Sequence, residues 1–288
     1  MLKELFGSSG WLGKFIQLIL ISLLFLILGF LLWSILGVSN TDIVSQKIFQ
    51  LVTALLFFIL PVFFLSRFWY EKPTETYYLN KLPSFKQFLL VILLTIAIQP
   101  FINLLAYLNG QIQLPASMKG LEGVFNTHEE GVEKLTNEFL AAHTVGGYLF
   151  NLFVMAVIPA FGEELFFRGA LQRIFSEQFS KHTSVWIVAI IFSFIHFQMS
   201  GFIPRMLLGA MFGYMVVWTR TLWLPMLAHL VNNGLGVTLG LFASHNYEVR
   251  KIEEFGKGDT LVYGILAGVV SIFIFLKIYY DTKKYPTE

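Results

Sequence analysis

Two adjacent carboxylates and one arginine lie inside a long apolar stretch of the chain. They are Glu163, Glu164 and Arg168. A charged side chain deep in a bilayer is costly, so such residues usually face a partner or a water-filled cavity. On a helix, Glu164 and Arg168 are four positions apart and share a face, which predicts an ion pair. Glu163 projects about 100° away from Glu164. It is therefore the candidate for chemistry, and a purely structural pair beside a protonated Glu163 is the alternative.

Two further polar motifs follow in apolar segments. His196 ends the sequence Phe-Ser-Phe-Ile-His, and His229 precedes Asn233 by one helical turn, so these two share a face. A single His in a helical bundle often only donates a hydrogen bond to a neighbouring helix. His196 is a candidate site residue because the other polar motifs occur in neighbouring segments. We assign Asn232 to packing. Together with Glu163, this set suits activation of water and stabilisation of an oxyanion.

The composition is that of an integral membrane protein. Of 288 residues, 56% are hydrophobic and 13% are charged, against about 25% charged in soluble domains. The absence of Cys excludes disulfides, thiolate metal ligands and a cysteine nucleophile. A net charge of +2 without a basic tract gives no indication of nucleic-acid binding.

An all-α integral membrane fold with about eight transmembrane helices is predicted, with the polar site in helices four to seven. A spanning helix needs about 20 apolar residues. The candidate spans are roughly residues 15–36, 48–69, 86–108, 147–175, 184–200, 204–219, 222–243 and 260–280.

The deep ionisable residues are confined to one part of the chain. We therefore predict a three-span scaffold with an outer loop in 1–146, a catalytic core in 147–243, and a last span with a cytoplasmic tail in 244–288. Within the outer loop, apolar residues at helical spacing predict a short amphipathic helix over Glu129–Ala142. We expect that helix to pack on the bundle rather than to cover the site.

The distribution of Lys and Arg predicts that both termini are cytoplasmic. Arg205 is counted here as an outer-loop residue. The first apolar run is too long for a signal-peptide core and is interpreted as a retained span. Helical rise places Glu163 and His196 near mid-depth, in a cavity expected to open toward the cytoplasm. The predicted location is a multi-pass position in a membrane, most simply the bacterial inner membrane.

The three motifs together resemble a known family. Glu-Glu-x-x-x-Arg at 163–168, Phe-x-x-x-His at 192–196 and His-x-x-x-Asn at 229–233 occur in the order found in type II CAAX prenyl proteases. Bacterial members are also called Abi or bacteriocin-processing (CPBP) intramembrane proteases. The resemblance implies an eight-helix membrane endopeptidase, a hydrolase that acts inside the bilayer on membrane-associated peptides or proteins, including CAAX-type prenylated ones.

The resemblance also implies a role for each site residue. Glu163 would be the general base and would hold the attacking water together with His196. His229 and Asn233 would stabilise the oxyanion. Glu164, paired with Arg168, would support the site and share the base role.

Two mechanisms and two other functions stay open at this point. A zinc-dependent metalloendopeptidase would use Glu163, His196 and His229 as ligands. We favour the metal-free mechanism, without a cofactor, because Asn233 is an unusual zinc ligand and suits a donor role. A non-catalytic immunity or partner-binding membrane protein is the second function considered. A proton-coupled transporter is the third, and it is disfavoured because no internal repeat is found. The sequence leaves the oligomeric state open.

Overall fold

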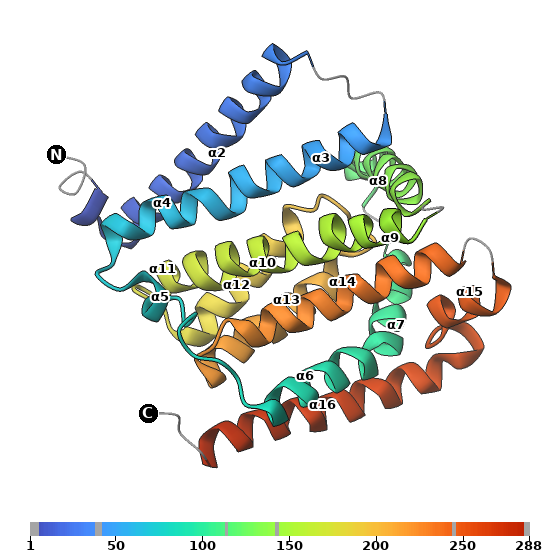
Figure 1. Ribbon diagram of the computed structural model, residues 1–288. Helices are drawn as coiled ribbons and strands as arrows, with labels where there is room; N and C mark the ends of the chain where they lie inside the picture. The colour runs from blue at the N-terminus through green and yellow to red at the C-terminus, as the bar shows by residue number, and fades with distance from the viewer. Residues whose placement is uncertain (1–5, 38–41, 113–114, 142–143, 244–245, 285–288) are drawn as a thin grey trace.

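The fold was analysed in a computed structural model that describes residues 6–37, 42–112, 115–141, 144–243 and 246–284. Within these ranges every regular element is a helix, which confirms the all-α prediction. Long helices lie side by side in one bundle (Figure 1). Helix α2 (Trp11–Ile35) begins and α16 (Leu261–Lys284) ends at one end of the bundle, while α8 (Lys119–Leu140) and α15 (Tyr247–Glu254) lie at the opposite end.

Six helical segments are long and apolar enough to cross a membrane. A seventh span results if α6 and α7, which are bent by 40° relative to each other, are counted together. Pro100 in the first turn of α7 lacks an N–H group, which accounts for the bend. The spans and their bounds are α2 (Trp11–Ile35), α3 to α4 (Ile43–Trp69), α6 (Phe85–Ala97) with α7 (Gln99–Gly110), α9 to α11 (Val145–Phe175), α13 (Phe202–Thr219), α14 (Trp223–Ala243) and α16 (Leu261–Lys284).

The predicted count of eight spans is not confirmed. The fifth candidate, predicted over 184–200, corresponds to α12 (Lys181–Phe194), which is apolar but has only 14 residues. About 20 residues are needed to cross the hydrocarbon core. Helix α12 therefore ends inside the bundle, and the chain turns there, immediately before His196.

The helix that carries the Glu-Glu motif is irregular near that motif. Two π-helical turns interrupt it, η3 (Phe153–Val157) and η4 (Leu165–Leu171). Pro159 follows η3 and cannot donate the usual helical hydrogen bond. π-Helical turns of this kind are frequent at functional sites. Arg168 lies inside η4, and its partner Glu164 is the residue directly before that segment.

Apolar packing connects the first spans with the site helix. Leu18 and Leu65 belong to the same buried cluster as Phe166 and Phe192. The ring of Phe166 stacks on that of Phe57 at 5.6 Å between centroids. The division of the chain at residues 146 and 243 stays a prediction, and these contacts cross its first boundary.

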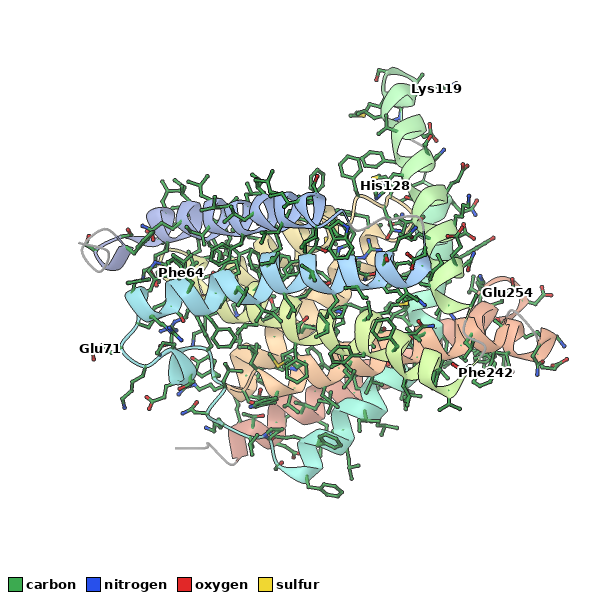
Figure 2. The ribbon with its side chains drawn as sticks, turned by 45° about the horizontal axis from the view of Figure 1, so that its top comes forward. Phe64, Glu71, Lys119, His128, Phe242 and Glu254 are labelled. Carbon is green, nitrogen blue, oxygen red and sulfur yellow. The ribbon has the colours of Figure 1, made fainter. Side chains whose placement is uncertain are left out.

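Helix α8 (Lys119–Leu140) is longer than predicted. The start expected at Glu129 is wrong, because the helix begins at Lys119 and includes Gly120 and Gly123. Isolated helical glycines cost only about 1 kcal/mol each. Figure 2 shows the Lys119 end of α8 projecting beyond the bundle.

Gly209 and Gly213 on α13 allow close approach of the helix that carries Arg168. A Cβ atom on Gly209 would lie 3.1 Å from Nη2 of Arg168. One on Gly213 would lie 2.7 Å from Oε1 of Gln172 and 3.0 Å from Cγ1 of Val185. Close helix contacts of this kind are typical of a Gly-x-x-x-Gly spacing.

Replacement of Gly213 by Val is expected to destabilise the protein by about 1–3 kcal/mol, because the added methyl groups overlap Gln172 and Val185. The measurement is the thermal midpoint of the purified protein in detergent. Gly236→Ala on α14 is the matched control, since no atom lies within 4 Å of its added Cβ. An unchanged midpoint for Gly213→Val would contradict the packing described here.

Candidate active site

The ion pair predicted between Glu164 and Arg168 is present and buried. Nη1 of Arg168 donates to Oε1 of Glu164 at 2.7 Å, and both side chains are inaccessible to solvent. Nη2 donates to the carbonyl of Gly209 at 3.0 Å. The guanidinium also lies over the ring of Phe192, 4.4 Å from its centroid. Arg168 is therefore held by a carboxylate, a backbone carbonyl and an aromatic face at once.

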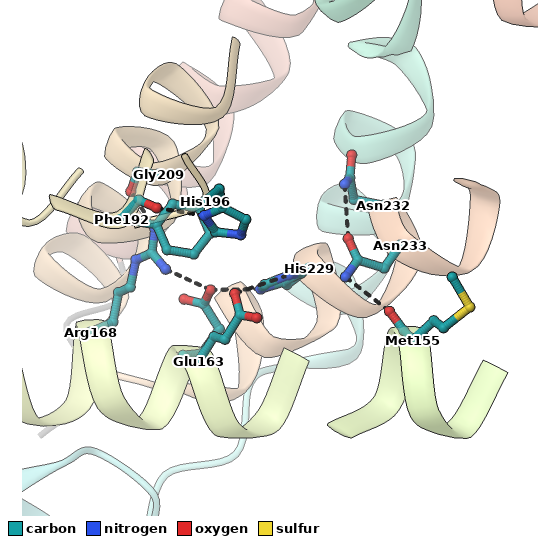
Figure 3. Close-up of polar contacts among 10 residues, drawn as sticks. Met155, Glu163, Arg168, Phe192, His196, Gly209, His229, Asn232 and Asn233 are labelled. Atoms are coloured by element: carbon teal, nitrogen blue, oxygen red, sulfur yellow. Dashed lines mark hydrogen bonds and ion pairs between the residues drawn. The ribbon is translucent and has the colours of Figure 1, made fainter. Parts of the chain in front are cut away.

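His229 contacts the carboxylate of Glu164 as well. Figure 3 shows the ring of His229 beside Glu163. Its Nδ1 lies 2.8 Å from Oε1 of Glu164, and its ring stacks on Phe212 at 5.6 Å between centroids. A carboxylate bound to arginine can only accept, so Nδ1 of His229 carries a proton. Nε2 points the other way and lies 4.0 Å from Oε2 of Glu163.

Glu163 is separated from the ion pair and faces a cavity. The cavity has a volume of about 710 Å³ and is lined by Glu163, His196, His229 and Asn233, among other residues. The side chain of Glu163 is 15% exposed, and that of Glu164 is fully buried. Within the described part of the chain, Oε2 of Glu163 has no hydrogen-bond partner. Oε2 of Glu164 also has no partner there, so Glu163 differs from Glu164 in its partial exposure and its position on the cavity wall.

His196 lies in the turn that follows α12. Its Nδ1 is 2.7 Å from the carbonyl oxygen of Phe192, one helical turn earlier. A carbonyl can only accept, so Nδ1 carries the proton and Nε2 is left as an acceptor. No direct hydrogen bond joins His196 to Glu163 in the described ranges, although both line the cavity. The arrangement leaves Nε2 of His196 available to a small molecule in that cavity.

Asn233 belongs to a row of amides on the cavity wall. Its Nδ2 donates to the carbonyl of Met155 at 3.2 Å, and its Oδ1 accepts from Nδ2 of Asn232 at 3.2 Å. Oδ1 of Asn232 in turn accepts from Gln99 at 3.2 Å. Both Asn232 and Gln99 line the cavity, so the sequence-based assignment of Asn232 to packing alone is incomplete. The one signal for Gln99 was a polar residue directly before a proline in an apolar span.

Sequence reasoning missed a second arginine at the site. Arg205, counted above as an outer-loop residue, lies in the first turns of α13 and lines the cavity. Its Nη2 donates to Oε1 of Gln198 at 2.5 Å. The only available signal was its position at the beginning of an apolar run, after Pro204.

Two peripheral helices cover the cavity. Val132 and Thr136 of α8 and Ile252 of α15 (Tyr247–Glu254) contribute to its lining. Glu129 of α8 accepts hydrogen bonds from N and Oγ of Ser200 at 3.0 and 2.6 Å. The expectation that the amphipathic helix does not cover the site is therefore wrong. Helix α8 lies at the end of the bundle away from the start of α2 and the end of α16 (Figure 1). The expected opening of the cavity toward the cytoplasm stays a prediction.

The alternative zinc ligands do not form a metal site. In the described ranges no group of three or more His, Asp or Glu side chains is placed to hold a metal ion. Nε2 of His229, the ring nitrogen not bonded to Glu164, is 4.0 Å from Oε2 of Glu163, farther than two ligands of one tetrahedral zinc ion lie from each other. The geometry of Glu163, His196 and His229 therefore does not fit a zinc site.

Comparisons with known proteins agree with the three motifs. Residues 145–235 match the family model described as type II CAAX prenyl endopeptidase Rce1-like. A relative from Bacillus subtilis (strain 168), "Uncharacterized protein YpbD", is 31% identical over 85 residues, which is 28% of this chain and 41% of that protein. No solved structure matches the chain significantly. The resemblance to this family is thereby confirmed over the region that contains all the motif residues.

Replacement of Arg168 by Ala is expected to destabilise the protein by about 3–5 kcal/mol, because Glu164 would remain as an unpaired buried charge. The measurement is the thermal midpoint in detergent, with exposed Arg173→Ala as the control. The double variant Glu164→Gln with Arg168→Met should recover part of the loss, because it removes both charges. Equal midpoints for Arg168→Ala and the control would contradict a stabilising pair.

Proposed function

We propose, from the family match over residues 145–235 and the geometry of the cavity, that this chain is an intramembrane endopeptidase. The observation that carries the proposal is the position of the Glu163 carboxylate on the cavity wall. Its Oε2 has no hydrogen-bond partner among the described residues, and it lies on a cavity beside two histidines and an asparagine. A carboxylate in that position is equipped to take a proton from water.

In the proposed reaction, Glu163 and Nε2 of His196 hold the attacking water between them. The tautomer of His196, fixed by the Phe192 carbonyl, leaves Nε2 as the hydrogen-bond acceptor that this role needs. The water oxygen attacks the peptide carbonyl carbon while Glu163 accepts one of its protons. Glu163 then passes that proton to the leaving amine nitrogen as the C–N bond breaks, so the carboxylate is regenerated.

His229 and Asn233 are proposed to stabilise the oxyanion of the tetrahedral intermediate. Because Nδ1 of His229 already donates to Glu164, donation from Nε2 requires the doubly protonated ring. Glu164 supplies the counter-charge for that ring and orients it. The amide of Asn233 would exchange its contact with the Met155 carbonyl for the oxyanion. Glu164 and Arg168 thus act as positioning residues. Oε2 of Glu164 has no hydrogen-bond partner in the described ranges, but Glu164 is fully buried and does not line the cavity, so we assign the base role to Glu163 rather than to both carboxylates.

The substrates and the location follow from the same proposal. The chain is a multi-pass integral membrane protein, since six or seven segments are suited to crossing a bilayer. We propose that it acts on membrane-associated peptides or proteins, including CAAX-type prenylated ones, in a bacterial inner membrane with both termini cytoplasmic. A lipid bilayer is its other partner, and no nucleic acid is expected.

A non-catalytic immunity or partner-binding protein is the second candidate function. The incomplete match to an uncharacterized relative, over 28% of the chain, is compatible with it. The intact set of Glu163, His196, His229 and Asn233 on one cavity favours catalysis.

Glu163→Gln and His196→Ala are each expected to lower proteolytic activity by about 10²–10⁴-fold, because each removes one of the two groups that hold the water. The thermal midpoint should change little, since neither side chain joins the buried ion pair. The measurement is a comparison of membrane proteomes that contain active protein or the Glu163→Gln variant, scored for new C-termini. Exposed Glu133→Gln on α8 is the control. Full activity in Glu163→Gln would refute the assignment, and identical proteomes would favour the non-catalytic function.

Exhaustive chelation is expected to leave the activity unchanged, because the nitrogen and oxygen donors at the site are not arranged as zinc ligands. The purified enzyme would be treated with chelator and assayed with and without added zinc, with its metal content measured in parallel. Loss of activity that zinc restores, with one bound equivalent, would establish the metalloendopeptidase instead.

A further inference from the structure

Arg205 is a cation on the cavity wall without a carboxylate partner. Its Nη2 donates to the neutral amide oxygen of Gln198 at 2.5 Å, and its buried Nη1 has no hydrogen-bond partner among the described residues. None of the ion pairs found in that part of the chain includes it. Glu163 and Glu129 are the acidic groups that attract it through space.

Arg168 differs from Arg205 because it has a carboxylate partner. Arg168 has a carboxylate at 2.7 Å, a backbone carbonyl at 3.0 Å and an aromatic face at 4.4 Å. Both arginines lie in helices suited to crossing the membrane, where a charge without a partner is costly. Arg168 is neutralised inside the protein, whereas the charge of Arg205 is left for something that enters the cavity.

Local backbone makes room for this guanidinium. A Cβ atom on Gly201 would lie only 2.9 Å from Nη2 of Arg205 and 3.3 Å from Cζ. Glycine at 201 therefore lets the guanidinium lie against the turn between His196 and α13. The same turn is tied to α8 through Ser200 and Glu129. Arg205 is thus held between the residue proposed to hold the water and the helix that covers the cavity.

We propose that Arg205 binds a carboxylate of the peptide substrate and so selects peptides that are cleaved close to that carboxylate. This inference rests on the proposed endopeptidase function. The planar guanidinium offers a fork of N–H donors that matches a carboxylate in a bidentate way, and the pair is strong where water is excluded. A cavity of about 710 Å³ encloses only a short peptide segment, so the bound carboxylate and the scissile bond are a few residues apart. The carboxylate is either the C-terminus or an acidic side chain.

The test measures binding, so that it does not depend on turnover. Four fluorescent peptides share one apolar sequence with a prenylated cysteine. The first pair differs only at the C-terminus, which is a free acid in one peptide and an amide in the other. The second pair has an amidated C-terminus and differs at one internal position, which is Asp in one peptide and Asn in the other. Their affinities are measured for the protein in lipid nanodiscs on a Glu163→Gln background, with and without Arg205→Met. Arg173→Met, an exposed site outside the cavity, is the matched control.

We expect at least one carboxylate peptide to bind about 10–100-fold more tightly than its neutral counterpart, as a charge-assisted hydrogen bond would give. Arg205→Met should reduce that ratio to about one, and Arg205→Lys should keep part of it. A preference for the free acid over the amide identifies the C-terminus, and a preference for Asp over Asn identifies a side chain. If Arg205 were purely structural, Arg205→Met would lower the thermal midpoint without changing the acid-to-amide or the Asp-to-Asn affinity ratio.

Absence of any carboxylate preference, or a preference that survives Arg205→Met, would overturn the inference. Cleavage of the four peptides by the protein with Glu163 intact is measured separately. Carboxylate-dependent binding without any Glu163-dependent cleavage would support the role of Arg205 and refute the proposed enzyme. A different result would be Glu163-dependent cleavage at equal rates for the acid and amide peptides and for the Asp and Asn peptides. That result would refute the role of Arg205 and leave the proposed enzyme intact.

Discussion

The buried contact between Arg168 and Glu164 is the constraint on which the rest of the site depends. A charge inside a membrane bundle must be compensated by groups that the fold itself brings together. Here these groups come from several elements: Glu164 from α10 (Ile158–Glu164), the Gly209 carbonyl from α13 and the Phe192 ring at the end of α12. His229 from α14 is added through the same carboxylate oxygen. The pair therefore fixes the relative positions of the helices that carry the site.

Several features of the packing follow from accommodating that pair. Gly209 lacks a side chain where Nη2 of Arg168 approaches, and Phe212 stacks on His229 while its ring lies 5.4 Å from the guanidinium. With Glu164 committed to two donors, the neighbouring Glu163 is the carboxylate that remains for the cavity. The separation of a supporting and a reactive carboxylate thus has a geometric origin in adjacent helical positions.

Contacts within one helix could be predicted from the sequence, whereas contacts between helices could not. The Glu164–Arg168 pair and the shared face of His229 and Asn233 depend on helical periodicity alone. The bond from His229 to Glu164 joins residues 65 positions apart, and nothing in the spacing specifies which nitrogen faces which carboxylate. The same limit applies to Arg205, which the distribution of Lys and Arg assigned to the outer side although it lies at the start of the span predicted over 204–219. The count of eight spans is not confirmed for a related reason, since α12 has only 14 residues and ends earlier than the predicted span.

The two arginines of the site illustrate how one residue type serves two purposes in a membrane interior. Arg168 contacts partners from the protein itself, so its charge contributes to the structure and does not face a substrate. Arg205 has a neutral amide as its side-chain partner and leaves a positive charge facing the cavity that also contains Glu163. A substrate carboxylate that binds there would otherwise be repelled by Glu163. The charge of Arg205 offsets this repulsion, so an anionic substrate group and the ionised base can occupy the same cavity.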